Sequence, residues 1–138
     1  MKIPSTLVRV TALLFLGVAV AVTQGADAPM GVRKVKDIVI YEDDGFHAAF
    51  PSVVKRPDGE VWVAFRRAPN RLLWGETHNN HVDPNSYLMM VRSSDGVTFS
   101  PEPELIYADA WGGSQDPCML QLRDGTLLCM TYGWTFVR

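Results

Sequence analysis

After position 35, short apolar runs alternate with polar, turn-forming residues along the chain. The runs are rich in Val, Ile, Leu, Met and aromatic residues, and they end at Asp-Gly, Pro or Gly. This punctuation is typical of short β-strands. We therefore predict an all-β chain with no helix after its N-terminal region. The predicted strands are residues 37–41, 50–55, 61–65, 86–92, 104–107, 118–122 and 126–132.

One stretch of this pattern occurs twice, 66 residues apart. Residues 51–65 and 117–131 both begin with Pro, carry Asp-Gly seven positions later, and have apolar runs on both sides. A third Asp-Gly, at Asp95 and Gly96, lies between them. A fixed-offset repeat predicts one supersecondary unit stacked several times. The alternative is a chance likeness between two hairpins of a β-rich chain.

The N-terminal residues have a different pattern and form a separate segment. A basic start is followed by an apolar run over residues 10–22 and by small residues up to Ala28. This is the pattern of a secretory signal, cleaved after about Gly25 or Ala28, and an uncleaved anchor is the alternative. We therefore predict a signal peptide at 1–25, a folded region at 26–138, and a secreted or periplasmic location without a membrane span after cleavage.

Composition narrows the function classes. Apolar residues make up 47% of the chain and charged residues 20%, which is ordinary for a globular domain. The net charge is −2 and no Lys/Arg cluster occurs, so no nucleic-acid partner is expected. There is no Gly-rich phosphate loop and no Ser nucleophile motif, and we predict no cofactor.

The two cysteines lie on either side of the second Asp-Gly. A two-residue turn at Asp124 and Gly125 would place Cys118 opposite Thr131 and Cys129 opposite Leu120. The thiols would then share a face but sit diagonally, about 7 Å or more apart. We predict two buried free thiols; a disulfide would need a two-residue shift in register.

The polar segment between Pro69 and Pro84 is long for a loop in a compact domain, and such loops tend to be functional. It contains His78, His81 and Asp83. The spacing is weak support for a metal site, and we predict none. His81 is instead a candidate substrate contact.

The segment Ser93-Ser-Asp95-Gly96-Val-Thr98-Phe99 resembles the Asp-box of sialidases and other Asp-box β-propellers, written Ser-x-Asp-x-Gly-x-Thr-Trp. This copy is one residue shorter between Asp and Gly and ends in Phe. The resemblance implies a structural motif, in which Ser and Asp bond the turn backbone and the aromatic ring packs into the blade. Asp95 is accordingly not expected to be catalytic.

The resemblance to sialidases extends from Phe46 to Trp134 through the order of several short motifs. It implies that Asp83 is the general acid, that Arg67 reaches the sugar from a hairpin end, and that Asp116 contacts the sugar. Arg66 takes the place of Arg67 if the strand register differs.

The resemblance also implies an architecture. The chain would form about the first two four-stranded antiparallel blades of a six-bladed β-propeller, and would be a fragment of it. A small sandwich is the alternative. The repeat and the chain end in mid-pattern favour the propeller, and we expect the fragment alone to be inactive.

One departure from the family affects the substrate. Ala49 occupies the place of the first of three arginines that grip the sialic acid carboxylate. Two functions therefore remain open. One is a secreted glycoside hydrolase of exo-α-sialidase type, acting on terminal sialic acid or a related sugar of a glycan. The other is a non-catalytic Asp-box propeller that binds carbohydrate or protein. Asp83, Arg67 and Asp116 favour the hydrolase, which is our leading hypothesis, and Ala49 favours the binding module.

Overall fold

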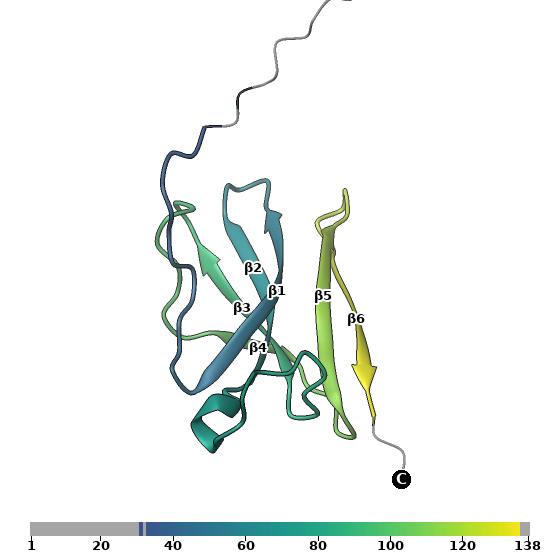
Figure 1. Cartoon of the computed structure of the whole chain (residues 1–138). Coiled ribbons are helices and arrows are strands. Elements are labelled where there is room, and N and C mark those ends of the chain that lie inside the picture. Colours follow the sequence, from purple (N-terminus) through teal and green to yellow (C-terminus); the bar gives the residue numbers. More distant parts are fainter. Residues whose placement is uncertain (1–30, 32, 136–138) are drawn as a thin grey trace, which may run out of the picture. The chain divides into compact units, whose positions relative to one another are not determined.

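A computed structural model describes residues 31 and 33–135, and it is all-β apart from one short helix (Figure 1). The predicted signal peptide lies outside the described residues and stays a prediction. Within the described part, no helix is long and apolar enough to cross a bilayer. The elements are β1 (Phe46–Lys55), β2 (Val61–Pro69), the 3₁₀ helix η1 (Arg71–Trp74), β3 (Tyr87–Ser93), β4 (Glu104–Tyr107), β5 (Gly113–Gln121) and β6 (Leu127–Trp134).

Two antiparallel sheets contain all six strands. The first sheet is a meander in the order β1-β2-β3-β4, and the second is the hairpin β5-β6. Six of the predicted strands are confirmed, several with longer ends. The helix η1 was not predicted, because four residues are too few to show a helical period.

The predicted strand at residues 37–41 is wrong. That segment has no strand assignment in the structure. Ile40 and Tyr41 instead pack against the core of the first sheet, and the Tyr41 ring stacks on Phe65 at 4.8 Å between centroids. The apolar residues that suggested a strand are explained by this packing, which covers the sheet rather than extending it.

The first sheet has a buried core on one face and β5 on the other. Its core joins Val63 and Phe65 of β2 to Val91 and Met89 of β3, which are their register partners. On the opposite face β5 contacts β1, β2 and β3 (Figure 1). The backbone N–H of Met119 donates to Ser52 Oγ at 2.9 Å, which joins β5 to β1.

The sequence repeat corresponds to two equivalent hairpins, as predicted. In the β1–β2 turn the N–H of Gly59 donates to the carbonyl of Arg56, and in the β5–β6 turn Gly125 donates to Leu122, each at 3.0 Å. Both glycines have positive φ, 95° and 89°, which a residue with a side chain rarely adopts. The two copies of the repeat therefore form hairpins with the same kind of turn.

The strands that enter these hairpins also share an irregularity. The register shifts in β1 next to Phe50 and in β5 next to Asp116. Phe50 (φ 55°) and Asp116 (φ 27°) are the non-glycine residues with positive φ in the described chain, and each precedes a proline. The two bulges thus lie at the same position in the two copies of the repeat.

The register of the second hairpin differs from the prediction by one residue. Cys118 is opposite Met130, and Cys129 is opposite Met119. The loop has three residues, with Gly125 in the left-handed conformation, rather than two. The cysteines therefore lie on opposite faces of the hairpin. Both are free, as predicted, but both are exposed, so their predicted burial is wrong.

Candidate functional site

The end of the sheets where β2 ends and β3 and β5 begin gathers the charged residues that the sequence singled out. Arg66 is near the end of β2, Asp83 precedes β3, and Asp116 lies in β5. The charges of Asp83 and Asp116 both act on Arg66. The Asp-box follows β3, whose last residue Ser93 pairs with Val61 at the start of β2, so it lies at the other end of the sheet.

Arg66 is fully buried, with 0% of its surface exposed, on the sheet face that β5 covers. Its Nη2 donates to the carbonyl of Asn80 at 3.0 Å, but Nε and Nη1 have no partner among the described residues. Burial lowers the pKa of the guanidinium, and the charges of Asp83 and Asp116 oppose this effect. A buried cation with two guanidinium nitrogens that lack an acceptor is costly unless a further acceptor reaches it.

Arg67 points to the opposite face and does not join this group, in contrast to our prediction. It donates from Nη2 to Asp43 Oδ2 (2.6 Å) and from Nη1 to the Tyr87 hydroxyl (3.1 Å). Its guanidinium also lies 3.5 Å from the centre of the Phe46 ring. These contacts give Arg67 a structural role. Arg66, the alternative considered from the sequence, is the arginine that lies beside Asp83 and Asp116.

Asp83 is 3% exposed and forms a bidentate ion pair with Arg71. Arg71 Nε and Nη2 donate to its two carboxylate oxygens at 2.6 and 2.9 Å, and the N–H of Asn85 adds a bond of 2.8 Å. Burial by itself raises the pKa of Asp83, but the bonds from Arg71 and Asn85 outweigh it and hold the pKa below its usual range. Asp83 is therefore a carboxylate at neutral pH in this geometry, whereas a general acid must carry a proton.

The segment that carries Arg71 is tied together by asparagines. Asn70 caps η1 by accepting from the N–H of Leu72, and its own amide donates to the carbonyl of Asp44 at 2.9 Å. Asn79 accepts from the N–H of Arg71 at 2.8 Å. These bonds fix the position of Arg71 and hence that of the ion pair with Asp83.

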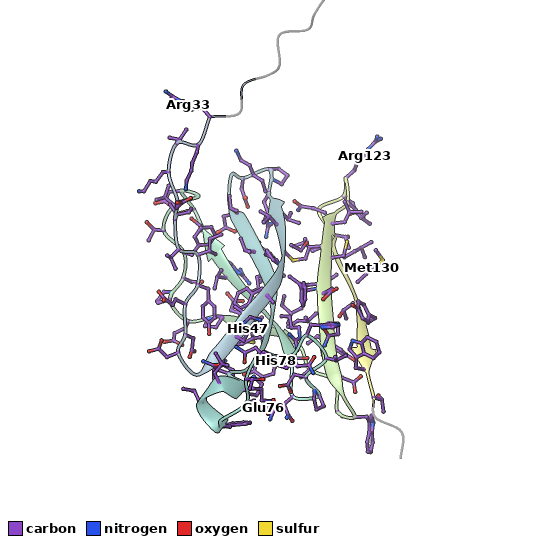
Figure 2. All side chains as sticks on the ribbon, viewed as in Figure 1. Arg33, His47, Glu76, His78, Arg123 and Met130 are labelled. Carbon is purple, nitrogen blue, oxygen red and sulfur yellow. The ribbon has the colours of Figure 1, made fainter. Side chains whose placement is uncertain are left out.

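The histidines of the segment are exposed and do not approach the ion pair. His78 Nδ1 is 3.0 Å from Thr77 Oγ1, and His81 is open to solvent. Figure 2 shows His78 and Glu76 at the η1 end of the molecule, opposite Arg123. In the described part of the chain, no three His, Cys, Asp or Glu side chains are grouped so that they could hold a metal.

Asp116 and Gln115 supply the acceptors of the site. Asp116 Oδ2 accepts from the Tyr132 hydroxyl at 3.0 Å, a bond that raises the pKa of Tyr132, while Oδ1 is buried without a partner. Gln115 is fully buried, and its Nε2 donates to Ser86 Oγ at 3.3 Å. Its Oε1 also has no partner in the described structure. Unused acceptors thus occur in the same part of the fold as the unused donors of Arg66.

The beginning of β5 is held against the segment before β3 through Ser86. Its hydroxyl oxygen lies 2.8 Å from the carbonyl oxygens of both Asp83 and Ser114. The N–H of Ser114 donates to the carbonyl of Ser86 at 3.0 Å. Gly113 lies so close that an added Cβ would be 2.1 Å from the carbonyl oxygen of Asp83. Small residues at these positions therefore allow the beginning of β5 to lie against the segment that carries Asp83.

Three residues of this group were not predicted as site residues: Arg71, Gln115 and Tyr132. The repeat could have identified two of them, since Tyr132 follows Arg66 by 66 residues and Gln115 follows Ala49 by the same interval. The register agrees, because Ala49 pairs with Arg66 and Gln115 pairs with Tyr132. Nothing in the sequence indicates that Arg71 pairs with Asp83.

Residues 93–99, which resemble an Asp-box, form a turn closed by local hydrogen bonds. Asp95 Oδ1 accepts from the N–H groups of Val97 and Thr98 at 2.8 and 2.7 Å, and Ser93 Oγ accepts from Gly96 at 2.8 Å. The backbone bonds, led by that from Thr98, lower the pKa of Asp95. Phe99 packs against the core of the first sheet.

The chain is similar to a solved structure, whereas two other comparisons found no match. No protein-family model and no curated protein matches the chain. It is similar to a crystal structure of a protein of unknown function from Dyadobacter fermentans DSM 18053, with 64% sequence identity and a TM-score of 0.73. The match covers 77% of this chain and 29% of that protein, so the chain spans less than a third of its length.

Proposed function

We propose that this chain forms about two blades of a sialidase-type β-propeller that acts on glycans outside the cytoplasm. Support comes from the four-stranded meander, the equivalent hairpin that follows it, and the packing of β5 on the face of the first sheet. Propeller blades are four-stranded antiparallel sheets of this kind. The first sheet would be one blade, and β5 and β6 would begin the next.

The observation that carries the glycan proposal is the group of unused polar atoms around Arg66. Its two unpaired guanidinium nitrogens, Nε and Nη1, lie in the same region as the unpaired oxygens of Asp116 and Gln115. Sugar hydroxyls both donate and accept, and an acidic sugar adds a carboxylate that suits a guanidinium. These atoms are buried in the described chain, so a glycan would provide the partners that the protein lacks only after the site had opened to admit it.

As a hydrolase of exo-α-sialidase type, the protein would use these residues in distinct roles. Arg66 would bind the sugar carboxylate or a hydroxyl, and Asp116 would accept from a hydroxyl. Asp83 would protonate the leaving oxygen only after substrate binding had moved Arg71 away, because the ion pair keeps it deprotonated. The tyrosine nucleophile of sialidases would belong to a further blade of the full-length protein. No cofactor is part of this proposal.

A second candidate is glycan binding without hydrolysis. The Arg71–Asp83 ion pair favours it, since it occupies both oxygens of the proposed acid. Ala49 favours it as well, because it pairs with Arg66 at the position where sialidases have an arginine. In this case Asp83 serves only to hold the segment before β3.

The test uses the full-length protein with sialosides that carry good and poor leaving groups. As a hydrolase, the wild type cleaves both, and Asp83→Asn lowers the rate on the poor leaving group by about two to four orders of magnitude. The rate on the sialoside with a good leaving group, an aryl glycoside, falls much less, because an aryl leaving group needs little protonation to depart. Equal losses on both substrates would remove Asp83 as the acid. Binding of sialosides without any turnover would establish the second candidate.

A further inference from the structure

Phe50 has a positive φ in the β1 bulge. A bulky residue at φ 55° is a true outlier, since glycine or asparagine would occupy this conformation at lower cost. Such outliers persist where the surrounding structure enforces them, and they cluster at ligand-binding sites. The chain nevertheless has an aromatic residue here.

Phe50 also occupies the position in the first repeat that Asp116 occupies in the second. Both are in bulges before a proline, 66 residues apart. The bulged strands are neighbours, because the Met119 N–H on β5 donates to Ser52 on β1. The backbone of Phe50 therefore follows directly after Ala49, the register partner of Arg66.

The ring of Phe50 is available for contact. Phe50 is 40% exposed, and it makes no ring–ring or cation–π contact in residues 33–135. The phenylalanines on the opposite face of the sheet have protein contacts: Phe46 packs against the guanidinium of Arg67, and Phe65 is buried in the core. Its neighbour Ala49 has only a methyl group as its side chain.

We propose that Phe50 is a specificity-determining residue that packs its ring against the apolar face of a bound pyranose. The β1 bulge would hold this ring beside the sugar while Arg66 and Asp116 bond its polar groups. An aromatic ring supplies apolar contact area and a directional stacking surface, which suits the C–H face of a sugar. This inference rests on the proposed glycan site and adds an apolar contact to it.

The experiment measures sialyllactose binding to the full-length protein by calorimetry, with a glycan array as a second assay. We expect Phe50→Ala and Phe50→Gly to weaken binding about threefold to tenfold, the usual worth of an aromatic contact, and Phe50→Tyr to retain it. The matched control is Val53→Ala, which removes another exposed apolar side chain of β1 beyond the bulge. It leaves binding unchanged.

Thermal unfolding of the same variants separates a ligand contact from a packing contact. If the ring is reserved for ligand, Phe50→Gly relieves the strain and unfolds at a higher temperature than Phe50→Ala. Equal and large destabilisation by both variants would assign the ring to the core and overturn the inference. So would a wild type that binds sialyllactose no better than the Phe50 variants do. A wild type that binds no glycan on the array overturns the glycan site, and the role of Phe50 with it.

Discussion

At the residue scale, the ion pair between Arg71 and Asp83 links stability to pH. The folded-state pKa of Asp83 lies below its ordinary value of 3.8. A depressed pKa means that the pair stabilises the fold above pH 3.8, and that this contribution is lost as the pH falls through the folded-state value. The pair is thus at full strength at neutral pH.

We expect Arg71→Met to lower the free energy of unfolding by about 2 kcal/mol at neutral pH, because it removes charge-assisted hydrogen bonds from a buried carboxylate. The difference from wild type should shrink as the pH falls below 3.8. Denaturant titrations across this range measure it. Arg123→Met is the control, since Arg123 is exposed in the β5–β6 turn. If the difference in free energy of unfolding between wild type and Arg71→Met stayed constant below pH 3.8, Arg71 would act through packing alone.

A second prediction at this scale concerns the Asp-box. Asp95→Ala removes the acceptor of the Val97 and Thr98 N–H groups, so the unfolding temperature should fall. Glycan binding by the folded fraction should not change, because the turn is at the opposite end of the sheet from Arg66. The exposed neighbour Ser94→Ala is the control and should alter neither. Lost binding in well-folded Asp95→Ala would place Asp95 in the site.

At the element scale, the glycines of the hairpins and of β5 have different functions. Gly59 and Gly125 are needed for their positive φ alone, since an added Cβ would meet nothing within 4 Å. Gly113 is needed for space, because a Cβ there would collide with the carbonyl of Asp83. The first type of glycine shapes a turn and the second brings two elements together.

We therefore expect Gly59→Ala and Gly125→Ala to cost about 1 kcal/mol each, with glycan binding unchanged, because only the conformational penalty is incurred. Gly113→Ala should cost about 3 kcal/mol and reduce binding as well, because it forces β5 away from the segment before β3. Chemical denaturation and calorimetry on the three variants measure both effects. Normal binding by Gly113→Ala would mean that this approach is not required for the site.

At the scale of the whole molecule, one face of the second sheet has no cover in the described structure. Leu120 and Leu128 pair across it, and Met130, Tyr132 and Trp134 continue the row along β6. All five are exposed, and Figure 2 labels Met130 on β6. A contiguous apolar face of this kind marks an interaction surface, which in the proposed propeller would be the contact with the following blade.

We expect residues 26–138, expressed alone, to be poorly soluble and inactive, because this face and the edges of the sheets stay open. Leu128→Lys and Met130→Glu should raise the soluble yield of this piece and destabilise the full-length protein. Leu72→Lys, at an exposed apolar residue of η1, is the control and should do neither. Size-exclusion chromatography and thermal unfolding measure these effects. A monomeric, cooperatively melting wild-type piece would contradict the prediction.

The amino-acid sequence determined where the strands and turns are. Asp-Gly turns and apolar runs act locally, so the equivalence of Gly59 and Gly125 was readable from spacing alone. The turn at residues 95–98 could be predicted for the same reason, since its hydrogen bonds join residues within one turn. The strand predicted at residues 37–41 was wrong because a short apolar run has the same pattern whether it joins a sheet or packs over one.

The tertiary structure alone decided which side chains share a face and which charges pair. Successive residues of a strand point to opposite faces, so the side chain of Arg66 is buried under β5 while that of Arg67 lies on the other face. For the same reason, a shift of one residue in the register of the β5–β6 hairpin puts Cys118 and Cys129 on opposite faces. The pairing of Arg71 with Asp83 depends on how the whole segment before β3 folds back. Short-range patterns specify the elements of this protein, whereas the charge state and composition of its site come from contacts between residues distant in sequence.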